Sequence, residues 1–173
     1  MKILFVIDNI EFKYFEFNKL VTSFWLIAGF LNKNYSVDIT TKDKLFLENN
    51  NPMGLTFKTF LKNNDIFKDT NFSKTNLNNY NVIFYRPDPP VDNDYINATY
   101  VLDYVNKSTF VLNNPQGLRN ANEKLFINNF PDIIPQNIAT SDTELIKEFL
   151  YEHKEIVIKP LNACFSKGVF YLN

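Results

Sequence analysis

Two lysines in the second half of the sequence have the character of ligands for an anionic group. Lys159 stands at the end of the strand-like run EIVIKPL (155–161), and a short polar loop separates it from a second apolar run, GVFYL. A lysine in that place presents a point charge to the loop, as a phosphate ligand does. Lys124 lies in RNANEKLFINNF, in what we expect to be the first turns of a helix. Taken alone, each lysine is read more simply as an exposed or snorkelling cation.

Arg86 and Asp8 are a second pair of candidates, because each follows a buried strand-like run. Arg86 ends NVIFYR (81–86), and Asp8 ends KILFVID (2–8). Ligands of open α/β sheets gather at the carboxyl ends of the strands, which makes these two residues candidates for binding a substrate. Each is equally readable as a strand-end residue in a turn. We assign no catalytic residue, since Cys164 has no base beside it in the sequence.

The elements that must position these residues indicate an α/β protein. Strand-like runs at 2–8 and 35–40 enclose a segment of helical length at 18–34, and such a β-α-β opening is typical of a parallel sheet. NVIFYR and STFVLN (108–113) predict further strands, with an amphipathic helix over 93–106 between them. The pattern is weaker between residues 41 and 75, where KLFLENN and GLTFKTFL flank an NNPMG turn and predict a β-hairpin.

The remaining third of the chain predicts a different, smaller unit. We expect a turn and then a helix over 114–130, a short strand at QNIAT, a helix at SDTELIKEFLYEH and a final hairpin. Ser141 and Glu144 have capping-box spacing for that helix. We therefore predict a boundary near residue 120. Residues 1–120 form a three-layer domain around an open, mainly parallel sheet, and residues 121–173 begin an incomplete α+β unit.

Composition excludes several classes of function. The formal net charge is −1, so the chain has no basic excess for a nucleic-acid backbone. One Cys and one His allow neither a disulfide framework nor a Cys/His metal cluster, and a reducing cytoplasm suits such a chain. The longest apolar stretch, at 20–31, is too short to span a bilayer. We expect a cytoplasmic protein that binds neither nucleic acid nor membrane.

Several motifs in fixed order resemble those of bacterial glutathione synthetase, a family with the ATP-grasp fold. RPDPP, ATY, NPQGLR and NEKLF carry the resemblance, which extends to FVIDNI and TSFWLIAGFLNKNY and is weak from about 41 to 75. It implies that residues 1–120 are the pre-ATP-grasp substrate domain. It also implies that residues 121–173 begin the nucleotide-binding domain.

The resemblance implies a reaction and roles for four residues. The family joins γ-glutamylcysteine to glycine with ATP and Mg²⁺, through an acyl phosphate, and cationic groups stabilise the charge on the transferring phosphoryl group. By resemblance, Lys124 and Lys159 contact the ATP phosphates. Asp8 and Arg86 match positions that face the peptide-substrate cleft.

The sequence departs from the family in the loop after the second lysine. The family has a glycine-rich loop there, whereas this chain reads NACFSKG and keeps only Gly168. Glycines let backbone N–H groups approach a phosphate, so Phe165 is expected to hinder the clamp. Ser166 is small and Lys167 supplies charge, so we group Ser166, Lys167 and Gly168 with the two lysines as the cofactor-binding set.

The family's Mg²⁺ ligands lie downstream of the part that this chain matches, so we predict no metal ligand here and no activity from this chain alone. The expected partners are the two small-molecule substrates, with either a homo-oligomer or a missing C-terminal part. The alternative is a non-catalytic, degenerate homologue that serves as a peptide- or partner-binding module. A different ATP-grasp peptide ligase is a third reading, which the local motifs fit less well.

Overall fold

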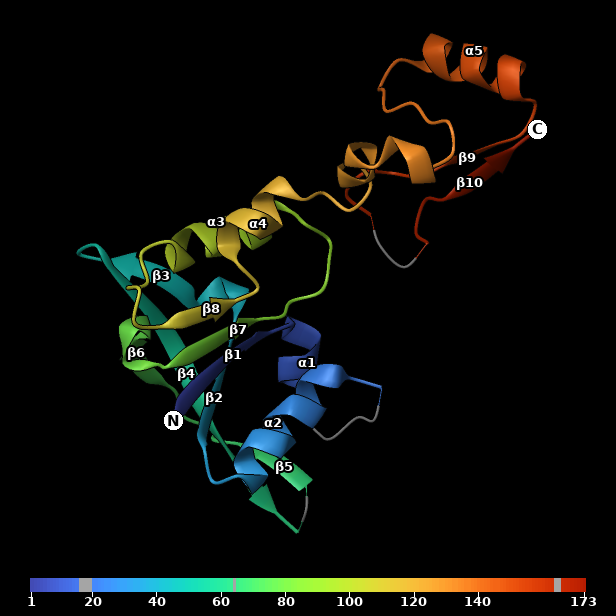
Figure 1. The fold of residues 1–173 in the computed structure, drawn as a ribbon. Coiled ribbons are helices and arrows are strands. Elements are labelled where there is room, and N and C mark those ends of the chain that lie inside the picture. Colours follow the sequence, from blue (N-terminus) through green and yellow to red (C-terminus); the bar gives the residue numbers. More distant parts are fainter. Residues whose placement is uncertain (16–19, 64, 164–165) are drawn as a thin grey trace. The chain divides into compact units, whose positions relative to one another are not determined.

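The computed structural model describes residues 1–15, 20–63, 65–163 and 166–173, and the chain divides into two compact units (Figure 1). Unit 1 is Met1–Arg119 and unit 2 is Asn120–Asn173. The division lies at the end of helix α4 (Pro115–Asn120).

Four parallel strands form the centre of unit 1. In spatial order they are β2 (Ser36–Thr41), β1 (Lys2–Ile7), β7 (Val82–Tyr85) and β8 (Phe110–Leu112). Strand β1 is hydrogen-bonded on both sides, and all five of its residues from 3 to 7 are fully buried. A continuous apolar run is what a strand covered on both faces requires. The predicted parallel strands are therefore confirmed.

Antiparallel strands extend the sheet beyond β2. The long strand β4 (Asn51–Lys62) pairs with β2, and three short strands pair with β4. These are β3 (Leu45–Glu48), β5 (Asp65–Lys68) and β6 (Ser73–Asn76).

The predicted hairpin within 41–75 is confirmed as β3 and β4, but its predicted turn is wrong. Asn49 and Asn50 make the turn with φ angles of 49° and 61°, while Pro52 and Gly54 lie inside β4. A two-residue hairpin turn of type I′ needs positive φ at both central positions, and Asn adopts it more readily than most residues. The asparagine pair therefore determines the turn.

Helices cover both faces of the sheet in unit 1, which confirms the three-layer α/β architecture (Figure 1). On one face, Ile3, Phe5 and Ile7 pack with residues of α2 (Thr22–Asn32). The short helix α1 (Asn9–Lys13) contributes Phe12 to the same face. On the other face, Leu4 and Val6 pack with α3 (Asn93–Leu102), and Leu118 of α4 joins them. Two 3₁₀ turns, η1 (Lys42–Lys44) and η2 (Leu77–Asn79), complete the unit.

Unit 2 ends in helix α5 (Thr143–His153) and the antiparallel hairpin of β9 (Ile156–Ile158) and β10 (Phe170–Leu172). The predicted final hairpin is thus confirmed. The predicted cap is wrong by one residue: Asp142 is the N-cap, and its carboxylate accepts a hydrogen bond from the N–H of Glu144 at 2.8 Å. Asp is among the best N-cap residues, so it takes that role in place of Ser141.

The segment between α4 and α5 differs most from its prediction. In place of a helix to residue 130, a turn at 123–125 leads into the 3₁₀ helices η3 (Phe126–Asn129) and η4 (Pro131–Ile133). QNIAT is not part of a strand. Lys124 therefore lies in a turn and not in a helix. The side chain of Asn122 accepts hydrogen bonds from the N–H groups of Lys124 and Leu125, as an N-cap does, and its backbone carbonyl accepts the N–H of Phe126 at 2.8 Å.

Replacing Phe5 by Ala tests the importance of the central strand. The Phe5 ring is fully buried and stacks on Phe84, with 4.5 Å between ring centroids. We expect the free energy of unfolding to fall by about 3 to 5 kcal/mol. Urea unfolding followed by the fluorescence of Trp25, the single tryptophan of the chain, reports on unit 1. The matched control is Phe60→Ala on β4, where 43% of the residue is exposed. Equal losses for the two variants would contradict this account of the core.

Candidate functional site

The carboxyl ends of β1 and β7 bring Asp8 and Arg86 to one edge of the sheet. The backbone N–H of Arg86 donates to the carbonyl of Val6 at 2.9 Å, which continues the β1–β7 pairing by one residue. The N–H of Asp88 donates to Oδ2 of Asp8 at 2.8 Å. Two residues far apart in the sequence are therefore held together by backbone geometry, as ligand sites of open α/β sheets require.

A third element orients the Arg86 side chain. Its Nε donates to the hydroxyl of Ser23 at 3.1 Å, and Ser23 is a buried residue in the first turn of α2. A guanidinium carries five N–H donors in a planar fork, so this bond orients the group and leaves donors for a carboxylate ligand. Arg86 itself is half-buried at the edge of the sheet.

Glu11 is a member of this edge that the sequence reasoning missed. It lies on α1, and its Oε2 accepts a hydrogen bond from the N–H of Asp8 at 3.4 Å. Burial, together with the negative charges of Asp8 and Asp88, raises the pKa of Glu11 to about 7, while Arg86 opposes that shift. Burial also raises the pKa of Asp8. The sequence feature that could have identified Glu11 is its capping-box spacing, three residues after Asp8.

Lys42 and Asp92 also lie close to this edge. The Nζ of Lys42, directly after β2, is 3.3 Å from Oδ1 of Asp92. Asp92 caps α3 by accepting the N–H of Tyr95 at 2.8 Å, and this bond, helped by Lys42, lowers the pKa of Asp92. Sequence reasoning passed over both residues, because neither belongs to a recognisable motif.

In unit 2 the structure brings Lys124 to the loop that follows β9. The Nζ of Lys124 donates to the carbonyl of Ala163 at 2.8 Å and to Oε1 of Glu123 at 2.7 Å. The first bond joins residues 39 apart in the sequence. Lys124 therefore contacts the loop that directly follows the other predicted lysine, Lys159.

The other predicted residues of unit 2 lie along that loop. Lys159 is exposed and directly follows β9, and Lys167 is exposed as well. Among the residues that the structure describes, neither forms a hydrogen bond or ion pair with another predicted site residue. Cys164 and Phe165, including the predicted obstruction by Phe165, lie outside the described residues.

A turn at 166–168 returns the chain to β10. Ser166 and Gly168 have φ angles of 58° and 72°, and the carbonyl of Ser166 accepts the N–H of Val169 at 3.2 Å. A Cβ added to Gly168 would lie 2.9 Å from Cγ of Pro160, the residue after Lys159. Glycine is therefore required where the loop passes the end of β9.

The lysines of unit 2 are donors of the kind that suits an anionic group. Lysine ammonium groups bind phosphate as point charges, and the close approach at Gly168 keeps the loop backbone near Lys159. Within the described ranges, no group of three or more His, Cys, Asp or Glu side chains is placed to hold a metal ion.

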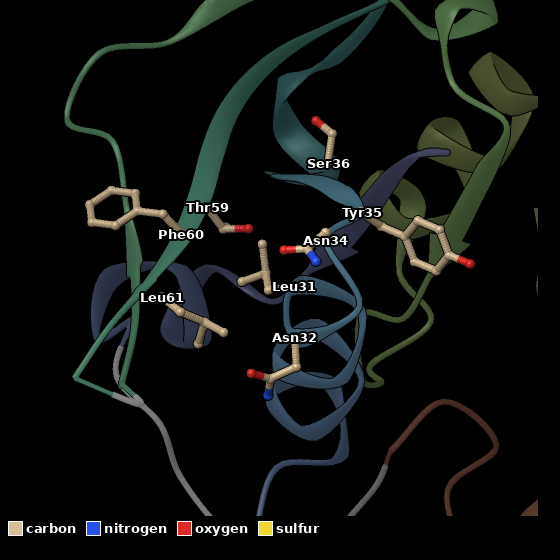
Figure 2. Close-up of a pocket in the computed structure, with 8 residues that line it drawn as sticks. All are labelled: Leu31, Asn32, Asn34, Tyr35, Ser36, Thr59, Phe60 and Leu61. Carbon is tan, nitrogen blue, oxygen red and sulfur yellow. The ribbon is translucent and has the colours of Figure 1, made fainter.

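A hollow of about 530 Å³ lies elsewhere in unit 1, between the end of α2 and β4 (Figure 2). Leu31, Asn32 and Tyr35 line one part of it, and residues 59–61 of β4 line another. All of its lining residues are neutral, so it offers no charged group to an anionic substrate. The predicted site residues are not among those that line it.

Two family models match the chain in the order of its two units. The one described as "Prokaryotic glutathione synthetase, N-terminal domain" matches residues 1–119. The one described as "Prokaryotic glutathione synthetase, ATP-grasp domain" matches residues 123–173. Among the described residues, no helix has the length and apolar character needed to cross a membrane.

Curated relatives give the same family description. A glutathione synthetase of Coxiella burnetii is 34% identical over 87% of this chain and 48% of its own length. That of Buchnera aphidicola is 33% identical over 86% and 47%, and that of Nitrosomonas europaea is 41% identical over 54% and 30%. The chain thus spans about half, or less, of the length of the curated relatives it matches.

Replacing Glu11 by Gln removes a carboxyl group whose pKa rises when the protein folds. The pKa of Glu11 is raised from 4.5 to about 7, so its stabilising contribution is complete below pH 4.5 and is lost as the pH rises to about 7. We expect the variant to match the wild type near pH 4.5 and to exceed its free energy of unfolding at pH 8 by about 1 to 2 kcal/mol, after discounting for solvent screening.

The measurement is urea unfolding at pH 5, 6, 7 and 8 with Trp25 fluorescence as the signal. The control is Asp69→Asn, which removes an exposed carboxylate from the same unit. A stability difference between Glu11→Gln and the wild type that stays constant from pH 5 to 8 would contradict the assignment.

Proposed function

Because the chain belongs to the prokaryotic glutathione synthetase family, we propose that it carries the substrate domain and the first nucleotide-binding segment of an ATP-dependent ligase. The proposed reaction joins γ-glutamylcysteine to glycine. The observation that carries the proposal is the agreement between the two family matches and the two structural units, with the same order and nearly the same boundary.

Unit 1 is proposed to hold the peptide substrate at the carboxyl edge of its sheet. At neutral pH, γ-glutamylcysteine carries two carboxylates and one ammonium group. Arg86, oriented by Ser23, suits a carboxylate, since a guanidinium binds carboxylates in a bidentate manner. Asp8, held by the N–H of Asp88, is an acceptor for the ammonium group.

Unit 2 is proposed to hold ATP, with Lys124 and Lys159 on its phosphates and Ser166, Lys167 and Gly168 in the adjoining loop. When bound, ATP would supply the phosphoryl group that turns a substrate carboxylate into an acyl phosphate with release of ADP, and attack by the amine of glycine would then form the amide bond and release phosphate. The lysines reduce the repulsion between the phosphate chain and the anionic substrate. In this arrangement Lys124 exchanges the carbonyl of Ala163 for a phosphate oxygen, which is the stronger acceptor because it is charged.

We propose that the whole ligase requires more than these 173 residues, since the match covers only about half of the length of the relatives from Coxiella burnetii and Buchnera aphidicola. We further propose that the protein is cytoplasmic. We also propose either a homo-oligomer or further polypeptide that completes the nucleotide site. Mg²⁺ accompanies ATP in the proposal. The retained lysines and both family matches favour this function over a non-catalytic binding module.

Removing either lysine tests the nucleotide site. We expect Lys124→Ala and Lys159→Ala each to weaken the binding of Mg·ATP by about tenfold or more, because each removes a charge-assisted hydrogen bond to phosphate. Isothermal titration of the purified chain measures the affinity. Lys147→Ala is the control, since Lys147 is an exposed lysine of α5 that pairs with Glu144 in the same unit. Unchanged affinity in both lysine variants would count against the proposed site.

A further inference from the structure

Asn122 forms three hydrogen bonds that join two separate segments of unit 2. Its Oδ1 accepts the N–H of Lys124 at 3.0 Å and the N–H of Leu125 at 3.2 Å. Its Nδ2 donates to the carbonyl of Leu161 at 3.2 Å, 39 residues further along the chain. The oxygen and the nitrogen of one side-chain amide therefore bind two different segments of the chain.

The two ends of this amide group act on the two proposed phosphate ligands. On the acceptor side, the oxygen fixes the turn at 123–125 and so sets the backbone position of Lys124. A short side chain that binds nearby N–H groups replaces the missing helical bonds at such a turn. On the donor side, the nitrogen holds the backbone two residues after Lys159.

A second bond connects the same two segments. The ammonium of Lys124 donates to Ala163, two residues beyond Leu161 in the loop. Asn122 and Lys124 thus bind alternate carbonyls of one short stretch. Of these two bonds, the one made by Lys124 is the one that a phosphate oxygen replaces, because a charged acceptor is stronger than a neutral carbonyl. The bond from Asn122 to Leu161 involves neither lysine side chain and persists when that exchange occurs.

We propose that Asn122 is the positioning residue of the nucleotide site, holding the turn of Lys124 beside the loop that follows Lys159 so that both lysines serve one phosphate chain. The inference rests on the proposed function, in which these lysines bind ATP. Asn122 touches no phosphate itself. Its effect on nucleotide affinity therefore passes through the lysines, and that dependence is what an experiment can isolate.

A double-mutant cycle on the complete 173-residue chain separates positioning from direct or general structural effects. The binding of Mg·AMP-PNP is measured by isothermal titration for Asn122→Ala, Lys124→Ala and the double variant. We expect each single variant to lose affinity by about tenfold, and the double variant to stay within about twofold of Lys124→Ala. The matched control is Asn128→Ala, whose Nδ2 donates to the carbonyl of Leu125 within the same short segment. The control is expected to bind like the wild type.

The outcomes distinguish the inference from the function on which it rests. Wild-type affinity in Asn122→Ala, or a double variant whose loss is the product of the two single losses, overturns the positioning role and leaves the proposed function in place. Absence of binding by the wild-type chain overturns the proposed phosphate site of Lys124 and Lys159, and the inference with it.

A conservative variant keeps the test decisive if Asn122→Ala does not fold. Asn122→Ser retains an oxygen acceptor for the N–H groups of Lys124 and Leu125 but lacks the amide donor that reaches Leu161. We expect hydrogen exchange at those two N–H groups to remain close to that of the wild type, while nucleotide affinity falls about threefold to fivefold. Wild-type affinity in this variant overturns the role assigned to the bond with Leu161.

Discussion

The burial of strand β1 on both faces is the constraint on which unit 1 depends. Each of its residues from 3 to 7 is fully buried, and alternate side chains enter the cores on opposite sides of the sheet. Pairing with β2 and β7 fixes the register, so the chain emerges from β1 at Asp8 beside the point where it emerges from β7 at Arg86. The geometry of the proposed substrate edge is thus a consequence of core packing.

Unit 2 is organised on a different physical basis. Among its described residues, Ile156 is the buried hydrophobic one, and many large apolar side chains are exposed. Hydrophobic burial therefore contributes little to fixing the segment around Lys124. Side-chain-to-backbone bonds from Asn122 and Lys124 hold that segment to the loop after β9. Local polar contacts thus have the positioning role that strand register has in unit 1.

The sequence predicted the parallel strands and the layers, because apolar runs and helical periodicity report directly on burial. It failed where a single polar side chain decides the backbone. Asn122 caps a turn and a 3₁₀ segment where a longer helix was expected, Asp142 is the N-cap in place of Ser141, and Asn49 and Asn50 form the hairpin turn that was predicted at NNPMG. Glu11 was missed because its importance depends on burial beside Asp8 and Asp88, which sequence spacing does not show.

We propose that this member of the glutathione synthetase family holds ATP through Lys124 and Lys159 in unit 2. A crystal structure of the chain with Mg·AMP-PNP tests it most directly. We expect phosphate oxygens within hydrogen-bonding distance of the Nζ atoms of both lysines, with the bond from Lys124 to Ala163 broken and the bond from Asn122 to Leu161 kept. A nucleotide whose phosphates contact neither lysine would contradict it.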